Sequence, residues 1–207
     1  MPVWWRELQA QARAATMQLD DNRVRIDPSA WVSETARLDV SRGPIIVGAR
    51  TRICDGAYIA GPTAIGDDCL IGNLVLVRGP VWIGNKTRIG FTTEIKSAII
   101  QDRVTIGPQC FVADSKIEHD AYLGAQVRTS NHRLDKASVR VMVDGNSIDT
   151  GLEKLGCLIG ARSALGIQVI ILPGRMIAPD SSFAPRITVE KNLPSGRYRL
   201  AQQLEAF

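Results

Sequence analysis

The chain has 207 residues, of which 45% are hydrophobic and only 5% are aromatic. This length allows one domain with a substantial core, and the aliphatic bias suits stacked branched side chains better than an aromatic-rich β-sandwich. The net charge of +4 is spread along the chain, so it is compatible with a phosphorylated ligand but too weak and unclustered to predict a nucleic-acid partner.

The cysteine content and the absence of long apolar segments indicate the compartment. The four cysteines have neither the paired spacing of a metal site nor the density of a small disulfide scaffold, so they are expected to be reduced thiols; they are Cys54, Cys69, Cys110 and Cys157. The opening residues lead directly into charged side chains without a signal peptide, and no apolar segment is long enough to span a bilayer. We therefore expect a cytoplasmic protein with no membrane partner.

The first predicted element is a short amphipathic helix from Trp4 to Met17. Its apolar side chains recur near one face and are Trp5, Leu8, Ala12 and Ala15. We expect this helix to cap the first coil of the repeat domain that follows it. Because Trp4 and Trp5 can also lie at an interface, a membrane-surface helix is the alternative, which the short length disfavours.

The centre of the chain carries an aliphatic residue at every sixth position. The nine residues in register are Val47, Ile53, Ile59, Ile65, Ile71, Val77, Ile83, Ile89 and Ile95. A period of six fits neither an isolated helix nor a hairpin, but it is typical of a parallel β-helix of hexapeptide repeats, in which each coil lends side chains to one internal stack. Glycine or another small residue follows many of them, and a residue without a Cβ suits a tight corner. The sequence therefore predicts an all-β fold.

The hexads also outline the domain. They begin irregularly at Ile26, slip after Ile95 and give way between residues 128 and 155 to a polar segment; a long loop of this kind tends to be functional. They return at Ile159, Leu165, Ile171, Ile177 and Phe183. We predict a single domain over residues 1–207, with an N-terminal helical cap at 1–25, a β-helix at 26–193 that contains loop 128–155, and a C-terminal helix at 194–207.

The repeat predicts a binding edge as well. If three hexads complete a coil, residues eighteen apart lie above one another at a spacing of about 4.8 Å. Arg78 and Lys96 are eighteen apart and each follows a core aliphatic residue, so two cations would be stacked at one edge, where a bound phosphate or carboxylate would offset their repulsion. Alternatively, both side chains point into solvent, or Glu94 neutralises one of them.

The chain has only two histidines, His119 and His132. Two cannot supply the three-histidine zinc site of some β-helical carbonic anhydrases, so we expect no metal. His132, in the long loop, is a candidate general base, although a loop histidine can also be a bystander; His119, at a turn, is the second candidate. Cys110 is a conceivable nucleophile, but nothing near it in the sequence would lower its pKa, which favours a buried structural thiol.

Three local motifs narrow the family. They are Glu-Ile-Lys-Ser-Ala-Ile-Ile at 94–100, Asn-His-Arg-Leu-Asp-Lys at 131–136, and the run 154–175 from Lys-Leu-Gly-Cys-Leu-Ile-Gly to Leu-Pro-Gly-Arg. With the hexads, they resemble the left-handed β-helix acyltransferases, and among these the acetyltransferase half of the bifunctional sugar-1-phosphate nucleotidylyltransferase/acetyltransferases. The nucleotidylyltransferase half has no counterpart, because no glycine-rich nucleotide loop precedes the coils.

The resemblance implies a left-handed β-helix that forms a homotrimer with active sites in clefts between subunits. It also implies acetyl-coenzyme A, or another acyl-coenzyme A, as the donor and a nucleotide sugar or sugar phosphate as the acceptor. Arg78 and Lys96 match the family's basic residues that contact the acceptor's phosphates or sugar. Asn131 matches an asparagine near the junction of donor and acceptor.

The sequence departs from the family where protons are transferred. The family's general-base histidine falls on Pro108, which cannot move a proton. The tyrosine three positions later becomes Phe111 and loses its hydroxyl, and a downstream asparagine becomes Tyr122. The sequence therefore keeps the residues that imply the family's architecture and anion contacts, but it lacks the family's proton-transfer groups.

Two functions remain open. In the first, an acyl group moves from a coenzyme A thioester to a hydroxyl or amine of an anionic acceptor; His132 is the base, with Asp114 or Asp135 behind it, and Asn131 orients the reacting group. In the second, acetyl transfer has been lost, and the β-helix binds an anionic metabolite or serves as a regulatory or scaffold subunit.

Overall fold

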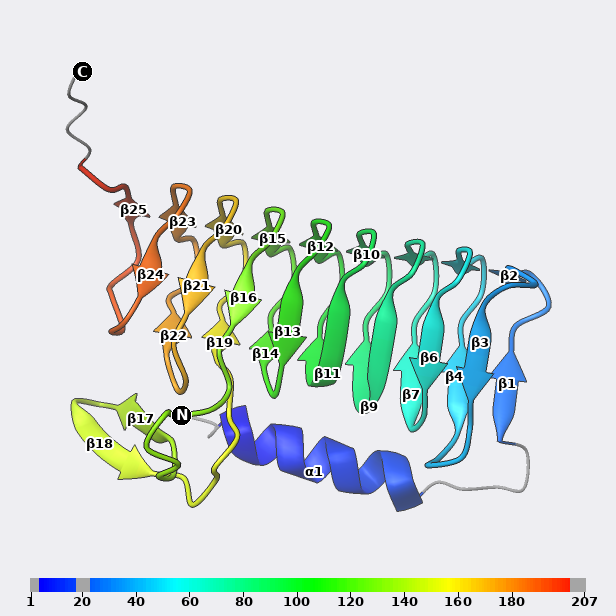
Figure 1. The fold of residues 1–207 in the computed structure, drawn as a ribbon, viewed down its shortest axis with the longest axis horizontal. Helices are drawn as coiled ribbons and strands as arrows, with labels where there is room; N and C mark the ends of the chain where they lie inside the picture. The colour runs from blue at the N-terminus through cyan, green and yellow to red at the C-terminus, as the bar shows by residue number, and fades with distance from the viewer. Residues whose placement is uncertain (1–3, 18–22, 202–207) are drawn as a thin grey trace.

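The computed structural model describes residues 4–17 and 23–201. Within them, one helix, α1 (Trp4–Met17), precedes twenty-five short strands. Figure 1 shows the strands stacked as successive coils along one axis, with α1 lying beside the stack. Neighbouring coils pair in parallel, so the predicted fold class, a left-handed parallel β-helix with a short N-terminal helix, is confirmed.

The coils have three faces, and the chain passes through them in turn. Face 1 holds β1 (Val24–Ile26), β4 (Ile45–Val47), β7 (Thr63–Ile65), the second halves of β9 (Leu76–Ile83) and β11 (Glu94–Ile100), β14 (Lys116–Ile117), β19 (Leu158–Ile159) and β22 (Met176–Ile177). Face 2 holds β2 (Trp31–Val32), β5 (Arg52–Ile53), β8 (Leu70–Ile71), β10 (Arg88–Ile89), β12 (Thr105–Ile106), β15 (Tyr122–Leu123), β20 (Ala164–Leu165), β23 (Ser182–Phe183) and β25 (Arg197–Tyr198). Face 3 holds β3 (Arg37–Asp39), β6 (Tyr58–Ala60), the first halves of β9 and β11, β13 (Phe111–Ala113), β16 (Arg128–Thr129), β21 (Ile170–Ile171) and β24 (Thr188–Val189).

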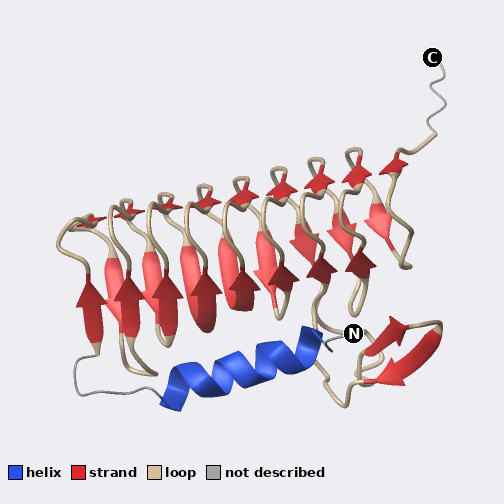
Figure 2. Ribbon diagram, turned by 180° about the vertical axis from the view of Figure 1, so that it is seen from behind, coloured by secondary structure: helices blue, strands red, loops and turns tan. Residues whose placement is uncertain are grey.

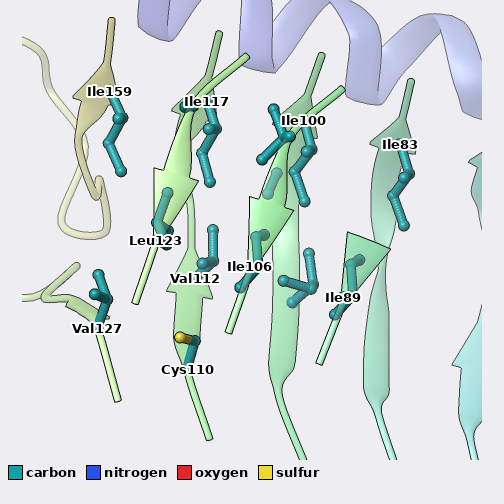
Figure 3. Packing of buried hydrophobic residues seen from close by; sticks show 14 of the residues in the cluster. Ile83, Ile89, Ile100, Ile106, Cys110, Val112, Ile117, Leu123, Val127 and Ile159 are labelled. Atoms are coloured by element: carbon teal, nitrogen blue, oxygen red, sulfur yellow. The ribbon is translucent and has the colours of Figure 1, made fainter. Parts of the chain in front are cut away.

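The aliphatic stack fills the interior of the coils. All nine residues of the predicted hexad run, from Val47 to Ile95, are buried, with no more than 2% of their surface exposed. Figure 3 shows the next coils continuing the stack with Ile100, Ile106 and Val112. Ile26, in the first coil, is 40% exposed because no further coil covers it. The sixfold period therefore corresponds to one stack position on each face of a coil.

Glycine follows many stack residues because the next coil lies close by, whereas the turn itself does not require it. A Cβ on Gly48 would lie 2.6 Å from the carbonyl carbon of Gly66, a distance that real Cβ atoms do not show. The left-handed conformation at the corners is instead adopted by other residues, such as Arg50 and Asp68, each with φ of 56°. Glycine is thus required at such a position because the adjacent coil leaves no room for a Cβ. The corner itself does not need a backbone conformation that favours glycine.

Two corners carry ladders of polar side chains, with one residue from each coil. At the corner from face 1 to face 2, guanidinium groups donate paired hydrogen bonds of 2.6–2.8 Å to carboxylates one coil away: Arg50 to Asp68, Arg103 to Asp120 and Arg162 to Asp180. At the corner from face 2 to face 3, Gln168 donates to Gln126 and Gln126 to Gln109, at 2.8 and 2.9 Å. These ladders link adjacent coils at positions whose sequence spacing follows the repeat.

The helix α1 begins and ends where the sequence predicts, but it does not cap the first coil. It lies along face 1 and contacts β9, β11 and β14 (Figures 1 and 2). The outer surface of face 1 is apolar at Trp82 and Ile99. Along this face the apolar side of α1 can bury more of its length than it could against the end of the stack. The predicted stripe residues Ala12 and Ala15 have side chains outside the described part of the structure.

The two tryptophans of α1 are buried in a second, smaller core. Trp4 and Trp5 are 3% and 4% exposed and pack with Val139, Val141 and Leu155. Their burial leaves neither indole free to lie at a membrane surface, so the interfacial alternative is wrong. No helix in the described part of the chain has the length and apolar character needed to cross a membrane.

The polar segment 128–155 has more structure than predicted. It begins with β16, and it contains a hairpin of β17 (Arg140–Val143) and β18 (Asn146–Asp149) that projects beyond the start of α1 (Figure 1). In β17, exposed Arg140 precedes buried Val141, and Val141 packs under α1. The expectation of a loop without secondary structure is therefore wrong. The alternation of exposed and buried residues in β17 is short and lies among polar residues, so the sequence did not indicate a strand there.

The predicted C-terminal helix at 194–207 is wrong for its described part. Residues 197–198 form β25, which pairs with β23. The ring of Tyr198 stacks on Phe183 with centroids 4.9 Å apart, so an aromatic pair covers this end of the stack. Residues 202–207 lie outside the described part of the chain.

Candidate functional site

The predicted pair Arg78 and Lys96 lies in register on adjacent coils, opposite each other in β9 and β11. The two side chains have different partners. Arg78 Nη1 lies 2.7 Å from Glu94 Oε1, and its side chain is 51% exposed. Lys96 Nζ lies 3.3 Å from Asp114 Oδ2, and its side chain is 21% exposed. The alternative in which Glu94 neutralises one cation is therefore observed, and the predicted backbone stacking is present as well.

Asp114 connects two of the predicted site residues. It lies at the corner between faces 3 and 1, with φ of 48°. Its Oδ2 accepts hydrogen bonds from Lys96 Nζ at 3.3 Å and from Asn131 Nδ2 at 2.5 Å. Because only 17% of its side chain is exposed, these two donors offset the cost of taking the carboxylate out of water. We call Lys96, Asp114, Asn131 and His132 the Asp114 cluster.

His132 reaches the same corner because the chain leaves the coil there. Asn131 O accepts a hydrogen bond of 2.9 Å from Leu155 N, and His132 and Lys154 form an antiparallel bridge. This bridge is the neck of the excursion that carries the hairpin. His132 is half-buried, and within the described residues its imidazole makes no hydrogen bond. The ring is thus available to bond a ligand.

A cavity of about 400 Å³ lies between α1 and face 1. Trp5 and Leu8 line it from the helix, and Trp82 and Ile99 line it from face 1. Asp114 belongs both to its wall and to the polar cluster, so the apolar cavity and the predicted site residues adjoin. We refer to it as the α1 cavity. Sequence reasoning missed it, because nothing in the hexads indicates which face α1 covers.

Sequence reasoning gave Asp114 only a secondary role and gave Lys154 none. Both were detectable in part. Asp114 is eighteen residues after Lys96, so a count by eighteens brings it close to Lys96, although the strand register places Ala113 opposite Lys96 and Asp114 one residue further on, at the corner. Lys154 opens the third local motif, but its position across from His132 depends on the closure of the excursion.

The other titratable candidates lie away from the cluster. His119 Nδ1 is 2.8 Å from Asp120 Oδ2, in the ladder between faces 1 and 2. Hydrogen bonds from Arg103 and then His119 lower the pKa of the Asp120 carboxyl. Asp135 forms an ion pair with Arg133, which lowers the pKa of Asp135. His119 and Asp135 are therefore held by partners outside the Asp114 cluster.

Cys110 and Pro108 belong to the corner between faces 2 and 3. Cys110 is buried, and this burial raises the pKa of its thiol to about 11, so it is protonated at neutral pH and does not act as a nucleophile. Pro108 O accepts the backbone hydrogen bond of Gln126. Because the whole of β13 separates this corner from Asp114, His132 does not occupy the place that the resemblance gives to the family histidine.

Comparison with known proteins gives a family. No family model matches the chain. The chain is 49% identical over 207 residues to a protein of Escherichia coli strain 536 named uncharacterized acetyltransferase YaiX; the match covers 99% of this chain and 90% of that one. It is 33% identical over 157 residues to a bifunctional sugar-1-phosphate nucleotidylyltransferase/acetyltransferase of Sulfurisphaera tokodaii, covering 76% of this chain and 39% of that one.

Among solved structures, the UDP-N-acetylglucosamine acyltransferase from Campylobacter jejuni matches with a TM-score of 0.40 at 18% identity, over 81% of this chain and 72% of that one. The family assignment depends on the sequence relatives, since the match to YaiX extends over nearly the full length of both proteins. The chain belongs to the hexapeptide-repeat acyltransferases, in the group that includes YaiX.

Proposed function

We propose that this acyltransferase moves an acetyl or other acyl group from a coenzyme A thioester to a hydroxyl or amine of an anionic acceptor, such as a sugar phosphate or nucleotide sugar. The observation that carries the proposal is the Asp114 cluster, where Asp114 binds Lys96 and Asn131, which come from separate parts of the sequence, and where His132 directly follows Asn131 in the chain. The sugar-1-phosphate in the name of the S. tokodaii relative supports the choice of acceptor.

Arg78 and Lys96 hold the charge of the acceptor. The ion pair of Arg78 with Glu94 lies at the surface, where such pairs contribute little, so the guanidinium can exchange Glu94 for a phosphate and gain charge-assisted hydrogen bonds. Lys96 is more buried and stays on Asp114. The two cations therefore have different roles: Arg78 exchanges its partner for the acceptor, and Lys96, paired with Asp114, donates its remaining hydrogen bonds at the same edge.

His132 serves as the general base. Its imidazole removes the proton from the acceptor's hydroxyl or amine while the oxygen or nitrogen bonds to the thioester carbonyl carbon. The carbon–sulfur bond then breaks, and the proton on the imidazole passes to the leaving coenzyme A sulfur. Asn131, fixed by its hydrogen bond to Asp114, orients the reacting group. Positioning at the cluster supplies much of the rate, as it does in other transfers between two bound substrates.

A homotrimer in the cytoplasm, without metal, nucleic-acid or membrane partners, completes the proposal. Outward apolar side chains support subunit contacts: Trp31 and Tyr122 on face 2 are 46% and 51% exposed, and Ile170 on face 3 is 39% exposed. Such side chains are commonly buried between subunits. Sedimentation of the full chain tests this part, and a monomer at micromolar concentration would contradict it.

A second function is favoured by one specific observation. Pro108 stands where the resemblance places the catalytic histidine, and His132 lies at another corner. In this alternative the β-helix binds an anionic metabolite without turnover, or acts as a regulatory or scaffold subunit. Mass spectrometry of a mixture of protein, acetyl-coenzyme A and sugar phosphates or nucleotide sugars separates the two functions. Free coenzyme A and an acylated sugar support transfer, whereas binding without either product supports the silent protein.

A further inference from the structure

The residues that line the α1 cavity extend parallel to the coil axis, and we call this elongated space the channel. Residues of five successive coils line it along the corner between faces 3 and 1: Pro44, Pro62, Pro80, Ser97 and Asp114. The parallel pairing of β4, β7, β9, β11 and β14 places them one above the other. Four coil spacings amount to about 19 Å, which matches the length of about 21 Å expected for the fourteen residues of α1.

The cavity is elongated along the stack. Its volume is about 400 Å³, and its lining residues extend over about 19 Å along the coil axis. Such an arrangement favours an extended ligand that lies along the axis over a compact one.

The walls of the channel are apolar and partly unburied. Trp82 is 53% exposed and Ile46 is 43% exposed, although both line the cavity beneath α1 together with Ala64 and Ile99. An apolar ligand would remove this surface from water, which is favourable in proportion to the area covered. Water gains few hydrogen bonds there, because most lining side chains carry no polar atom.

The two charged side chains that line the channel lie at one end of it, whereas the uncharged polar residues Gln9 and Thr63 line it elsewhere. Asp114, Ser97 and Lys154 line that end, and Asp114 is joined there to Lys96 and Asn131. The other end is formed by Pro44, Ile46 and Ala14. A ligand that matches this arrangement has a polar head at the Asp114 cluster and a hydrocarbon tail that leads away from it.

We propose that the α1 cavity binds the hydrocarbon chain of a long-chain acyl donor, with the thioester carbonyl at the Asp114 cluster and the tail beneath α1. This inference rests on the proposed function, because it places the reacting carbonyl beside His132. It makes the transferred group longer than acetyl. A free fatty acid has the same tail and a different head, so the test includes both ligands.

Titration calorimetry with coenzyme A thioesters of two, six, ten and fourteen carbons, and with decanoate, tests the proposal. In the full-length protein, affinity should rise two- to fourfold per added methylene until the tail reaches the Pro44 end of the channel. Ala64→Trp fills the middle of the channel and should abolish this rise while leaving acetyl-coenzyme A binding unchanged. Ala164→Trp is the matched control, because Ala164 is also an outward, half-buried strand residue but lies on face 2; it should bind as the wild type does.

Equal affinity for all four thioesters would overturn the chain-binding proposal and leave the proposed function intact. Binding of decanoate, lost in Ala64→Trp, without binding of any thioester would keep the channel as a fatty-acid site but contradict its use for a thioester donor, and it would also contradict the proposed function. A change of oligomeric state in Ala64→Trp, with an unchanged dependence on chain length, would identify the cavity as a subunit contact and overturn the proposal.

Discussion

Asn131 Nδ2 donates a hydrogen bond of 2.5 Å to Asp114 Oδ2, and this contact ties the neck of the excursion to the preceding coil. Lys96 binds the same carboxylate oxygen from the coil that precedes Asp114. One carboxylate thus fixes the position of two residues that the sequence predicted separately. The cluster is therefore as rigid as the coil corner that carries Asp114.

Replacing Asp114 with Asn tests this positioning role. Asparagine tolerates the φ of 48° at this corner and keeps the size of the side chain, but it removes the charge that Lys96 and Asn131 bind. We expect kcat to fall by about 10- to 100-fold, in line with a loss of positioning, while KM for an anionic acceptor is unchanged or lower because Lys96 becomes an uncompensated cation. Asp135→Asn is the control, since Asp135 pairs with Arg133 outside the cluster. Equal kcat in Asp114→Asn and wild type would remove Asp114 from the site.

Arg78→Gln tests the contact with the acceptor. The variant loses a charged donor at the surface, so KM for an anionic acceptor should rise about tenfold, with little change in kcat. Arg50→Gln is the control, because Arg50 is similarly exposed but pairs with Asp68 at another corner. Steady-state kinetics with a sugar phosphate measure both values. A KM that does not change in Arg78→Gln would show that the acceptor's charge is held elsewhere.

The arginine–aspartate ladder should stabilise the coils at neutral pH and lose this effect in acid. Hydrogen bonds from Arg162 lower the pKa of the Asp180 carboxyl in the folded protein, so the folded state binds a proton less readily than the unfolded chain does. This contribution is fully present above the ordinary aspartate pKa of about 4 and is lost as the pH falls below it. Asp180→Asn should therefore have a lower Tm than the wild type at pH 7, by a small amount because the pair is exposed. The difference should narrow at pH 3; a constant difference would exclude this origin.

Shortening a residue of the aliphatic stack should be costly. Ile95 has 0% exposure and lies between the inward residues Val77 and Val112 of the adjacent coils. Ile95→Ala removes buried methyl and methylene groups and leaves a cavity, so the free energy of unfolding should fall by about 2–5 kcal/mol. Ile46→Ala, on an exposed position of β4, is the control and should cost much less. Denaturant unfolding compares them, and similar losses in both variants would contradict the assignment of inward and outward positions.

The hexads predicted the fold because each coil repeats the same local requirement, an inward aliphatic residue on a short strand. The same count by eighteens placed Arg78 beside Lys96, as the strand register confirms. The sequence offered Glu94 as a partner of one cation, which is observed for Arg78. It did not predict the ion pair of Lys96 with Asp114, because side-chain pairing depends on which way each chain turns at the corner. The roles of Arg78, Lys96, Asn131 and His132 in catalysis stay predictions.

Features that depend on contacts between distant segments were beyond the sequence. The pattern of α1 identified a helix with one apolar face, but not whether that face covers the end of the stack or its side. The strand that holds buried Val141 is short and surrounded by polar residues, so its pairing with β18 was missed. The α1 cavity lies where α1 and the end of the excursion, at Leu152, Lys154 and Leu155, meet face 1.

If acyl transfer takes place at the Asp114 cluster with His132 as the base, replacing His132 with Ala should remove most of the turnover. Coenzyme A release from a thioester should occur in the wild type with a sugar phosphate or nucleotide sugar, and it should fall by about 100-fold or more in His132→Ala. His119→Ala, at the ladder between faces 1 and 2, should retain full turnover. Wild-type turnover in His132→Ala would contradict the role of His132, and a wild type that binds the thioester but releases no coenzyme A would contradict acyl transfer itself.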